Sequence, residues 1–252
     1  SSNATIGLRR AALLVLILTA LPWLGSKYIP LAVILGIYSM WRGCGLAKVL
    51  ILAAGIMSAA AYIWFHLNVF GGLTPYSLNL VYTGQTTTGI IVEHVEFFER
   101  VYRLWGLFID QRFGIGRWAP LLLLGAIVAP CTWNQGKIAR LVLSLLGVQL
   151  LVATFIAITM MGWWFPGRTL MTVLPLIALP IATFWIRSGP AAHVGIVGIT
   201  AYSLTVTVAL ASAGHAREVV LAVNPFDMQF ALFAATASLF PNYTSWSLHT
   251  WG

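Results

Sequence analysis

Charged side chains are scarce in this 252-residue sequence: only 8% of the residues are charged, whereas 60% are apolar. A soluble domain usually carries about 25% charged residues, because polar groups must cover the surface that meets water. The apolar residues also occur in blocks that approach the roughly 20 residues of helix needed to cross a hydrocarbon core about 30 Å thick. Since a span must satisfy its own backbone hydrogen bonds in a bilayer, the sequence predicts an all-α, polytopic transmembrane helix bundle.

The sequence has few cysteines and lacks the common catalytic motifs. Cys44 and Cys131 are the only cysteines, so the sequence implies no disulfide framework and no cysteine-rich metal site. It contains no Walker loop, nucleophile elbow, dinucleotide fingerprint or zinc-protease helix, and we expect neither a metal nor a cofactor. The net charge of +8 does not predict nucleic-acid binding, because the basic residues are scattered singly over short loops.

The apolar residues define about seven candidate spans, of which five are long and the first two are short. Their approximate ranges are 11–24, 28–41, 47–69, 119–133, 139–162, 169–187 and 190–211. The short N-terminal pair is expected either to span as tilted helices or to form one re-entrant hairpin. Either alternative leaves the orientation of the later spans unchanged. Pro175 and Pro180 predict a kink in the sixth segment.

The charges at the two ends of these spans predict the topology, because cytoplasmic loops are enriched in Lys and Arg. One side carries basic residues and no acid, namely Arg9, Arg10, Arg42, Lys48, Lys137, Arg140 and Arg187. The other side carries Lys27, Arg100, Arg103, Arg112, Arg117, Arg168 and Arg217 together with all six acids, Glu93, Glu96, Glu99, Asp110, Glu218 and Asp227. The acid-free side is the predicted cytoplasmic side. Residues 1–211 then form the bundle, with an external loop over 70–118, and residues 212–252 form an external tail.

The second half of the external loop has the pattern of an amphipathic helix over residues 92–109. One face carries apolar side chains at spacings of three or four, namely Val95, Phe98, Tyr102, Trp105 and Ile109. The opposite face pairs Glu96 with Arg100, and Glu99 with Arg103, at the i,i+4 spacing that stabilises helices. We expect this helix to lie in the membrane interface.

Asp110, Gln111 and Arg112 follow this helix and precede the fourth span. An acid, an amide and a guanidinium at the membrane surface are suited to an anionic or sugar substrate, with Arg112 as a fork for phosphate oxygens. The structural alternative is an Asp that caps a turn and an Arg whose guanidinium reaches lipid head groups.

Trp163, Trp164 and Arg168 lie in the predicted external link between the fifth and sixth spans. Indole rings stack on sugars or isoprenoid chains, and Arg168 at a helix start is placed to bind phosphate. The alternative is an aromatic belt, because Trp is enriched at membrane interfaces in general.

Three stretches resemble a family of bacterial multi-spanning proteins. Residues 104–114 read LWGLFIDQRFG and precede WAP at 118–120, which is similar to the family pattern GLLFDQ-(R/E)-(F/Y)-G followed by YAP. Residues 163–168 and 174–176, WWFPGR and LPL, resemble WWGG…PPARFL…PLLPLLALP, although the paired glycines are missing. LPWL at 21–24 with KY at 27–28 resembles LLPWLHxRY. The family comprises proteins related to the GT-C glycosyltransferases, such as the dolichyl-phosphate-mannose protein mannosyltransferase-like proteins.

The resemblance implies a GT-C bundle in a bacterial plasma (inner) membrane that takes a sugar from a polyprenyl-phosphate donor at the non-cytoplasmic face. In such enzymes the catalytic carboxylate lies in the first external loop, ahead of everything that aligns here. The chain is therefore expected to be a C-terminal portion, and Asp110 is not expected to be the catalytic base. Asp110, Gln111, Arg112 and Arg168 become candidates for shaping the donor or acceptor site.

Two other functions remain open at this point. A transporter or flippase for a lipid or hydrophobic solute predicts a path open to both sides. The candidate spans carry Lys48, Arg140 and Arg187 only at their ends, and their interiors contain none of the charged residues that ion-coupled transporters usually bury. A non-catalytic membrane scaffold predicts no cavity. The sequence predicts membrane lipid as a partner and leaves the oligomeric state undefined. It also leaves open whether the C-terminal tail folds over the site or lies in the interface.

Overall fold

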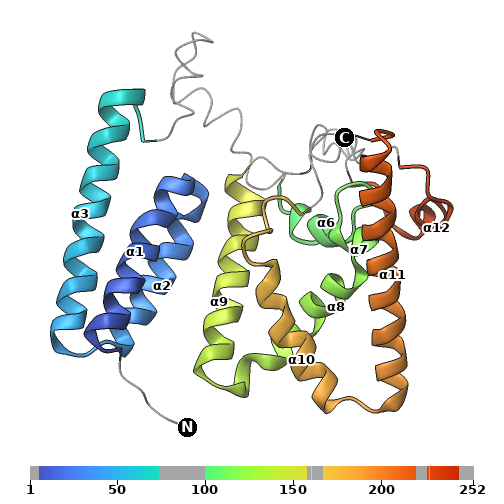
Figure 1. Ribbon diagram of the computed structural model, residues 1–252, viewed down its shortest axis with the longest axis horizontal. Coiled ribbons are helices and arrows are strands. Elements are labelled where there is room, and N and C mark those ends of the chain that lie inside the picture. Colours follow the sequence, from blue (N-terminus) through green and yellow to red (C-terminus); the bar gives the residue numbers. More distant parts are fainter. Residues whose placement is uncertain are drawn as a thin grey trace. The chain divides into compact units, whose positions relative to one another are not determined.

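The computed structural model describes residues 6–73, 100–157, 160, 167–219, 226 and 228–243. Within these ranges the chain is helical and contains no strand, apart from one isolated bridge between Ile6 and Gly43. The predicted all-α class is therefore correct for the described residues (Figure 1). The chain forms two compact units, residues 1–96 and 97–252.

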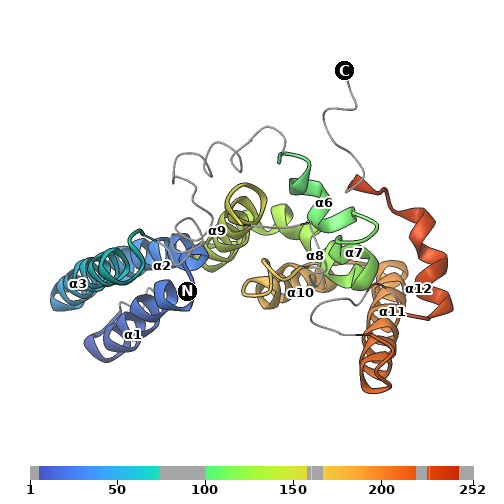
Figure 2. The same cartoon turned by 90° about the horizontal axis from the view of Figure 1, so that it is seen from above.

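The first unit contains α1 (Leu8–Leu24), α2 (Ile29–Arg42) and α3 (Gly45–Phe70), with a short 3-10 turn, η1 (Ser26–Tyr28), between the first two. Helix α1 packs against both α2 and α3, and Figure 2 shows the three helices from above. At one end of α3, the ring of His66 stacks on Tyr62 with 3.8 Å between centroids, and Trp23 of α1 contacts both. The Nδ1 atom of His66 is 2.9 Å from the carbonyl oxygen of Tyr62, so this buried imidazole serves packing.

The second unit begins with short helices and continues into longer ones. The short elements are α6 (Arg103–Ile109), α7 (Ile115–Trp118), α8 (Pro120–Val128) and the 3-10 segment η2 (Ala129–Gln135). Helix α9 (Lys137–Leu151) continues as a π-helical turn, η3 (Val152–Ile156). The chain then forms η4 (Leu174–Ile177), α10 (Ala178–Arg187), α11 (Pro190–His215), α12 (Ala231–Ala235) and η5 (Thr236–Leu239).

Helix α8 packs against both α10 and α11. The contact with α10 is close enough to require glycine at position 125, because a Cβ atom there would overlap the side chains of Ile177 and Ile181. Trp118 and Phe233 belong to a core cluster that also includes Val206 and Leu210 of α11. The short helices and the C-terminal segment are thus packed against a long helix rather than standing alone.

Three helical segments are long and apolar enough to cross a membrane among the residues described: Gly45–Phe70, Lys137–Ile156 and Pro190–His215. They correspond to the third, fifth and seventh predicted spans. Helices α1 and α2 have 17 and 14 residues and coincide with the short N-terminal pair. The structure thus supports a membrane protein with three such helices, while the larger number of about seven spans stays a prediction.

The fourth and sixth predicted segments differ from continuous helices. The fourth divides into nine-residue α8 and the 3-10 segment η2, which has Pro130 in its first turn. In the sixth, residues 167–173 form turns, and the α-helix starts only at Ala178. Pro175 and Pro180 lie in the first turns of η4 and α10, where a missing N–H costs little. The two elements follow each other without a gap over Leu174–Arg187, and the predicted kink stays a prediction.

The predicted amphipathic helix is tested only over its second half, because residues 92–99 lie outside the described residues. Residues 100–102 form a turn, and α6 begins at Arg103. Arg100 donates from Nη1 to the carbonyl oxygen of Phe155 at 2.9 Å, at the end of η3. A cation there is stabilised by the carbonyl groups and the dipole at the helix C-terminus.

Thr154 has an unusual environment in the π-helical turn. On α11, the hydroxyls of Thr200, Ser203, Thr205 and Thr207 each donate to the carbonyl oxygen four residues earlier, at 2.7 to 2.8 Å. Thr154 is fully buried, and its hydroxyl makes no hydrogen bond to any residue that the structure describes. The π-helical bond from Ala157 N–H to the Val152 carbonyl oxygen (2.8 Å) shows that the regular α-helical hydrogen bonding is interrupted here. An unsatisfied buried hydroxyl is destabilising.

We predict that Thr154→Val stabilises the protein by about 1 to 3 kcal/mol, because it replaces an unpaired buried hydroxyl by a methyl group of similar shape. The measurement is the thermal unfolding midpoint in detergent, followed by tryptophan fluorescence. Thr200→Val is the matched control and should give no such increase, because that hydroxyl is already paired. A lower midpoint for Thr154→Val would show that the hydroxyl has a native partner.

Candidate functional site

Asp110 holds together the turn between α6 and α7. Its carboxylate is fully buried, and Oδ1 accepts hydrogen bonds from the backbone N–H groups of Arg112 (2.8 Å) and Phe113 (2.7 Å). Oδ2 accepts a third from the N–H of Tyr243 (2.8 Å). This is the local capping for which Asp side chains are favoured in turns. The carboxylate therefore acts in the described structure as a structural acceptor, and a direct contact with substrate stays a prediction.

Gly114 completes this turn, and we call residues 110–114 the corner. The N–H of Gly114 donates to the carbonyl oxygen of Asp110 at 2.9 Å. A Cβ atom on Gly114 would overlap the backbone N and O atoms of Asp110. Asp110 and Gly114 of the DQRFG stretch thus have complementary roles in one turn, because the first caps the turn and the second allows it to close.

The C-terminal segment 228–243 packs onto the corner. The backbone N–H of Gln111 donates to the carbonyl oxygen of Pro241 at 2.7 Å, and its side-chain Nε2 donates to the carbonyl oxygen of Ala237 at 3.1 Å. The ring of Tyr243 lies 6.3 Å from that of Tyr102. Of the two positions considered for the tail, the described part takes the one that covers this site.

Arg112 and Arg117 both contact aromatic rings on the C-terminal side of the chain. The guanidinium of half-buried Arg112 lies 4.3 Å from the ring centroid of Phe226 and 5.4 Å from that of Phe113. Cation–π contacts of this kind favour a protonated guanidinium near an aromatic face. Arg112 therefore packs on aromatic rings of the unit, and the alternative in which it extends to lipid head groups stays a prediction.

Arg117 was not among the predicted site residues, yet its guanidinium makes several contacts near the corner. Its Nη1 donates to the carbonyl oxygen of Gln111 (2.9 Å), its Nη2 donates to that of Phe233 (2.8 Å), and the guanidinium lies 3.8 Å from the Phe233 ring. Burial lowers the pKa of Arg117, and the nearby Tyr202 acts in the opposite direction. In the sequence, nothing distinguishes this arginine from a residue that orients the next span.

Trp163 and Trp164 lie outside the described residues. Arg168 is exposed and follows Gly167, whose φ of 72° begins a turn. Because residues 167–173 form turns and η4 begins at Leu174, Arg168 does not stand at a helix N-terminus as predicted. The prediction that a helix dipole helps Arg168 to bind phosphate is therefore wrong. Its exposed side chain still carries the positive charge that a phosphate contact needs.

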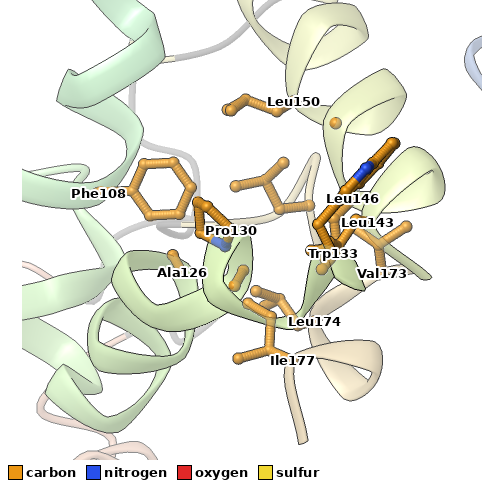
Figure 3. A pocket seen from close by; sticks show the side chains of 13 residues that line it. Phe108, Ala126, Pro130, Trp133, Leu143, Leu146, Leu150, Val173, Leu174 and Ile177 are labelled. Atoms are coloured by element: carbon orange, nitrogen blue, oxygen red, sulfur yellow. The ribbon is translucent and has the colours of Figure 1, made fainter. Parts of the chain in front are cut away.

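A cavity of about 340 Å³ lies in the second unit, between α8 with η2 on one side and α9 with η4 on another (Figure 3). Phe108 of α6 and the turn before η4 complete its wall. The lining residues are all apolar: Phe108, Ala126, Ala129, Pro130, Trp133, Leu143, Leu146, Gly147, Leu150, Leu170, Val173, Leu174 and Ile177. The glycosyltransferase hypothesis predicts from the sequence a polar external cavity under the loop over 70–118, faced by Arg112 and Arg168. This cavity is apolar instead, and neither arginine lines it.

The cavity can hold an apolar group but offers no catalytic side chain. Among the lining side chains only the indole of Trp133 carries a polar atom, and that atom is a hydrogen-bond donor. The residues that the structure describes also contain no group of three His, Cys, Asp or Glu side chains that could hold a metal ion. Among the predicted site residues that the structure describes, the polar ones lie beyond the cavity wall, at the corner and at Arg168.

Comparison of the chain with models of protein families, with curated proteins and with solved structures finds no match.

We predict that Asp110→Ala frees the backbone N–H groups of Arg112, Phe113 and Tyr243, because their shared acceptor is removed. Each such loss costs about 1 to 3 kcal/mol locally, so their hydrogen exchange should accelerate clearly. Asp110→Asn is the control and should have a smaller effect, because its side-chain oxygen still accepts. Unchanged exchange in Asp110→Ala would contradict a structural role for the carboxylate.

Proposed function

We propose that this chain is a portion of a GT-C-like glycosyltransferase of the bacterial inner membrane, and that it handles a polyprenyl-phosphate-linked sugar at the non-cytoplasmic face. The observation that carries the proposal is the apolar cavity of the second unit. An apolar cavity supports the proposal because the lipid part of such a substrate is a long hydrocarbon chain. The three resembling stretches of sequence add the substrate class.

The wall of the cavity matches hydrocarbon in chemistry and size. No charged side chain lines it, and its volume of about 340 Å³ falls within the roughly 300 to 1,000 Å³ typical of ligand pockets. A hydrocarbon segment placed there would be removed from surrounding solvent and would contact wall atoms on several sides, which favours binding through dispersion and burial. A sugar ring would leave its hydroxyl groups without partners in this cavity.

Two residues of the cavity wall are close in sequence to the polar candidates. Leu170 lines the wall and follows Arg168 by two residues, and Phe108 lines it and precedes Asp110 by two residues. In this proposal the chain lies in the cavity and the phosphate meets the exposed guanidinium of Arg168, because guanidinium groups bind phosphate oxygens in a fork. Gln111 and Arg112 then shape the corner on which the polar end of the substrate rests.

Asp110 has a positioning role in this proposal and no proton-transfer role. Three of the acceptor positions of its buried carboxylate are engaged by backbone N–H groups. The catalytic carboxylate is instead assigned to the first external loop of the complete enzyme, as the resemblance implies. A flippase is less well supported, because among the described wall residues only Trp133 has a polar side-chain atom that could accompany a head group across the membrane.

The test is binding of a polyprenyl-phosphate sugar to the protein in lipid nanodiscs. We predict saturable binding that weakens about 10- to 100-fold in Arg168→Ala, because a hydrogen bond to a charged group contributes about 1.5 to 3 kcal/mol. Arg140→Ala is the matched control, because Arg140 is also exposed but lies at the start of α9. Its Nε atom lies near the carbonyl oxygen of Trp133 in η2. Arg112→Ala measures whether the corner shares the site.

The corresponding polyprenyl alcohol separates the chain from the phosphate. It should bind equally to the wild type and to Arg168→Ala, because it has no phosphate for the guanidinium. Absence of saturable binding of the phosphate sugar, or equal binding to the wild type and Arg168→Ala, would contradict the proposed function.

A further inference from the structure

We assign the mouth of the apolar cavity to its three exposed wall residues. Pro130, Trp133 and Gly147 are exposed, with 49% of Trp133 accessible, whereas the other wall residues are buried or half-buried. Pro130 and Trp133 belong to η2 and Gly147 to α9, so the mouth lies between these two elements. Figure 3 shows Trp133 beside Leu143 and Leu146 of α9, and Pro130 on the side of Phe108.

Gly147 leaves this mouth open. It lies on the wall-forming face of α9 with Leu143, Leu146 and Leu150, at the spacings that place residues on one side of a helix. It is the only wall residue without a side chain, and a Cβ atom at this position would meet no atom within 4 Å. The space beside Gly147 is therefore empty, and a large side chain there would enter the mouth without first displacing a neighbour.

One edge of the mouth, at Gly147, belongs to a candidate membrane span. The segment Lys137–Ile156 is long and apolar enough to cross a bilayer. The stretch from Leu143 to Leu150 covers about 10 Å of helix axis, which fits well inside a hydrocarbon layer about 30 Å thick. In a bilayer, the molecules next to an exposed face at this depth are lipid chains. Water would find no hydrogen-bond acceptor on the wall side chains, so it is a poor occupant.

We propose that the hydrocarbon chain of a membrane lipid enters the cavity sideways from the bilayer, through the mouth beside Gly147, and lies along α9. The empty apolar volume favours this occupant, because wall atoms that face a void lack dispersion partners which a chain supplies. The inference rests on the proposed function only for the identity of the natural chain as polyprenyl. The lateral entrance itself requires no sugar and no phosphate.

The test uses the protein in nanodiscs that contain a phospholipid with a diazirine in its acyl chain. After irradiation, mass spectrometry maps the labelled residues. Label on the buried wall residues Val173 and Ile177 is the decisive readout, because chains outside the protein reach exposed Trp133 in any case. We expect the wild type to be labelled at these buried residues, and Gly147→Trp to lose that label while keeping label at Trp133.

Two variants serve as controls for the added bulk. Gly198→Trp places the same side chain on α11, where a Cβ atom also meets nothing within 4 Å and no cavity wall is present, so the buried label should persist. Gly147→Ala adds too little volume to close the mouth and should also keep it. Gly147→Leu provides a second closing variant if the tryptophan variant does not fold.

The proposal is overturned if the wild type shows no label at Val173 and Ile177, or if both closing variants retain it. The phospholipid probe carries no sugar phosphate, so this result is independent of the binding test for the proposed function. Loss of sugar-phosphate binding in Arg168→Ala together with failed labelling would leave the proposed function standing without a lateral entrance. Labelling without any binding of the polyprenyl-phosphate sugar would leave the entrance and remove the proposed substrate.

Discussion

The architecture of the second unit depends on the buried carboxylate of Asp110. Three backbone N–H groups from two segments more than one hundred residues apart in the chain converge on it. If a carboxylate were buried without such donors, it would be strongly unfavourable. The corner that it caps places Phe108 in the cavity wall on one side and the C-terminal segment on the other. The polar corner and the apolar cavity are therefore two parts of one packing arrangement.

The arginines near the corner illustrate how a membrane protein uses charge when it has little of it. Arg117 satisfies carbonyl groups of Gln111 and Phe233, and Arg112 stacks on Phe226. Both guanidiniums thus link the segment before α8 to the C-terminal part of the chain. Arg168 differs because its side chain is exposed, which makes it the best placed of the predicted residues to meet a phosphate.

Sequence reasoning predicted the class of the fold but not how every apolar segment is built. Composition and segment length were sufficient for the all-α class and for the long helices α3, α9 and α11, because a continuous apolar run without internal proline has few alternatives. The same reasoning failed in the sixth segment. Hydropathy does not show where an α-helix begins. In the structure the α-helix begins at Ala178, after the 3-10 turn that contains Pro175.

The site was predicted in part for similar reasons. Turn capping by Asp110 was one of the two interpretations of the sequence, because a short acidic side chain before a glycine has few local conformations. The partner of Arg112, Phe226, is 114 positions away in the chain, and no local pattern identifies such a pair. The cavity arises where side chains of separate helices leave space unfilled, so it depends on packing that a sequence pattern does not specify.

In the proposed arrangement the cavity beside α9 belongs to the hydrocarbon phase of the membrane. Its environment can be measured through the collision rate of a nitroxide at position 147, introduced as Gly147→Cys in protein whose Cys44 and Cys131 are replaced by serine. We expect the nitroxide to collide more with oxygen, which concentrates in hydrocarbon, than with a water-soluble nickel chelate. Greater collision with the nickel chelate would show a water-filled mouth and would contradict a cavity filled by lipid.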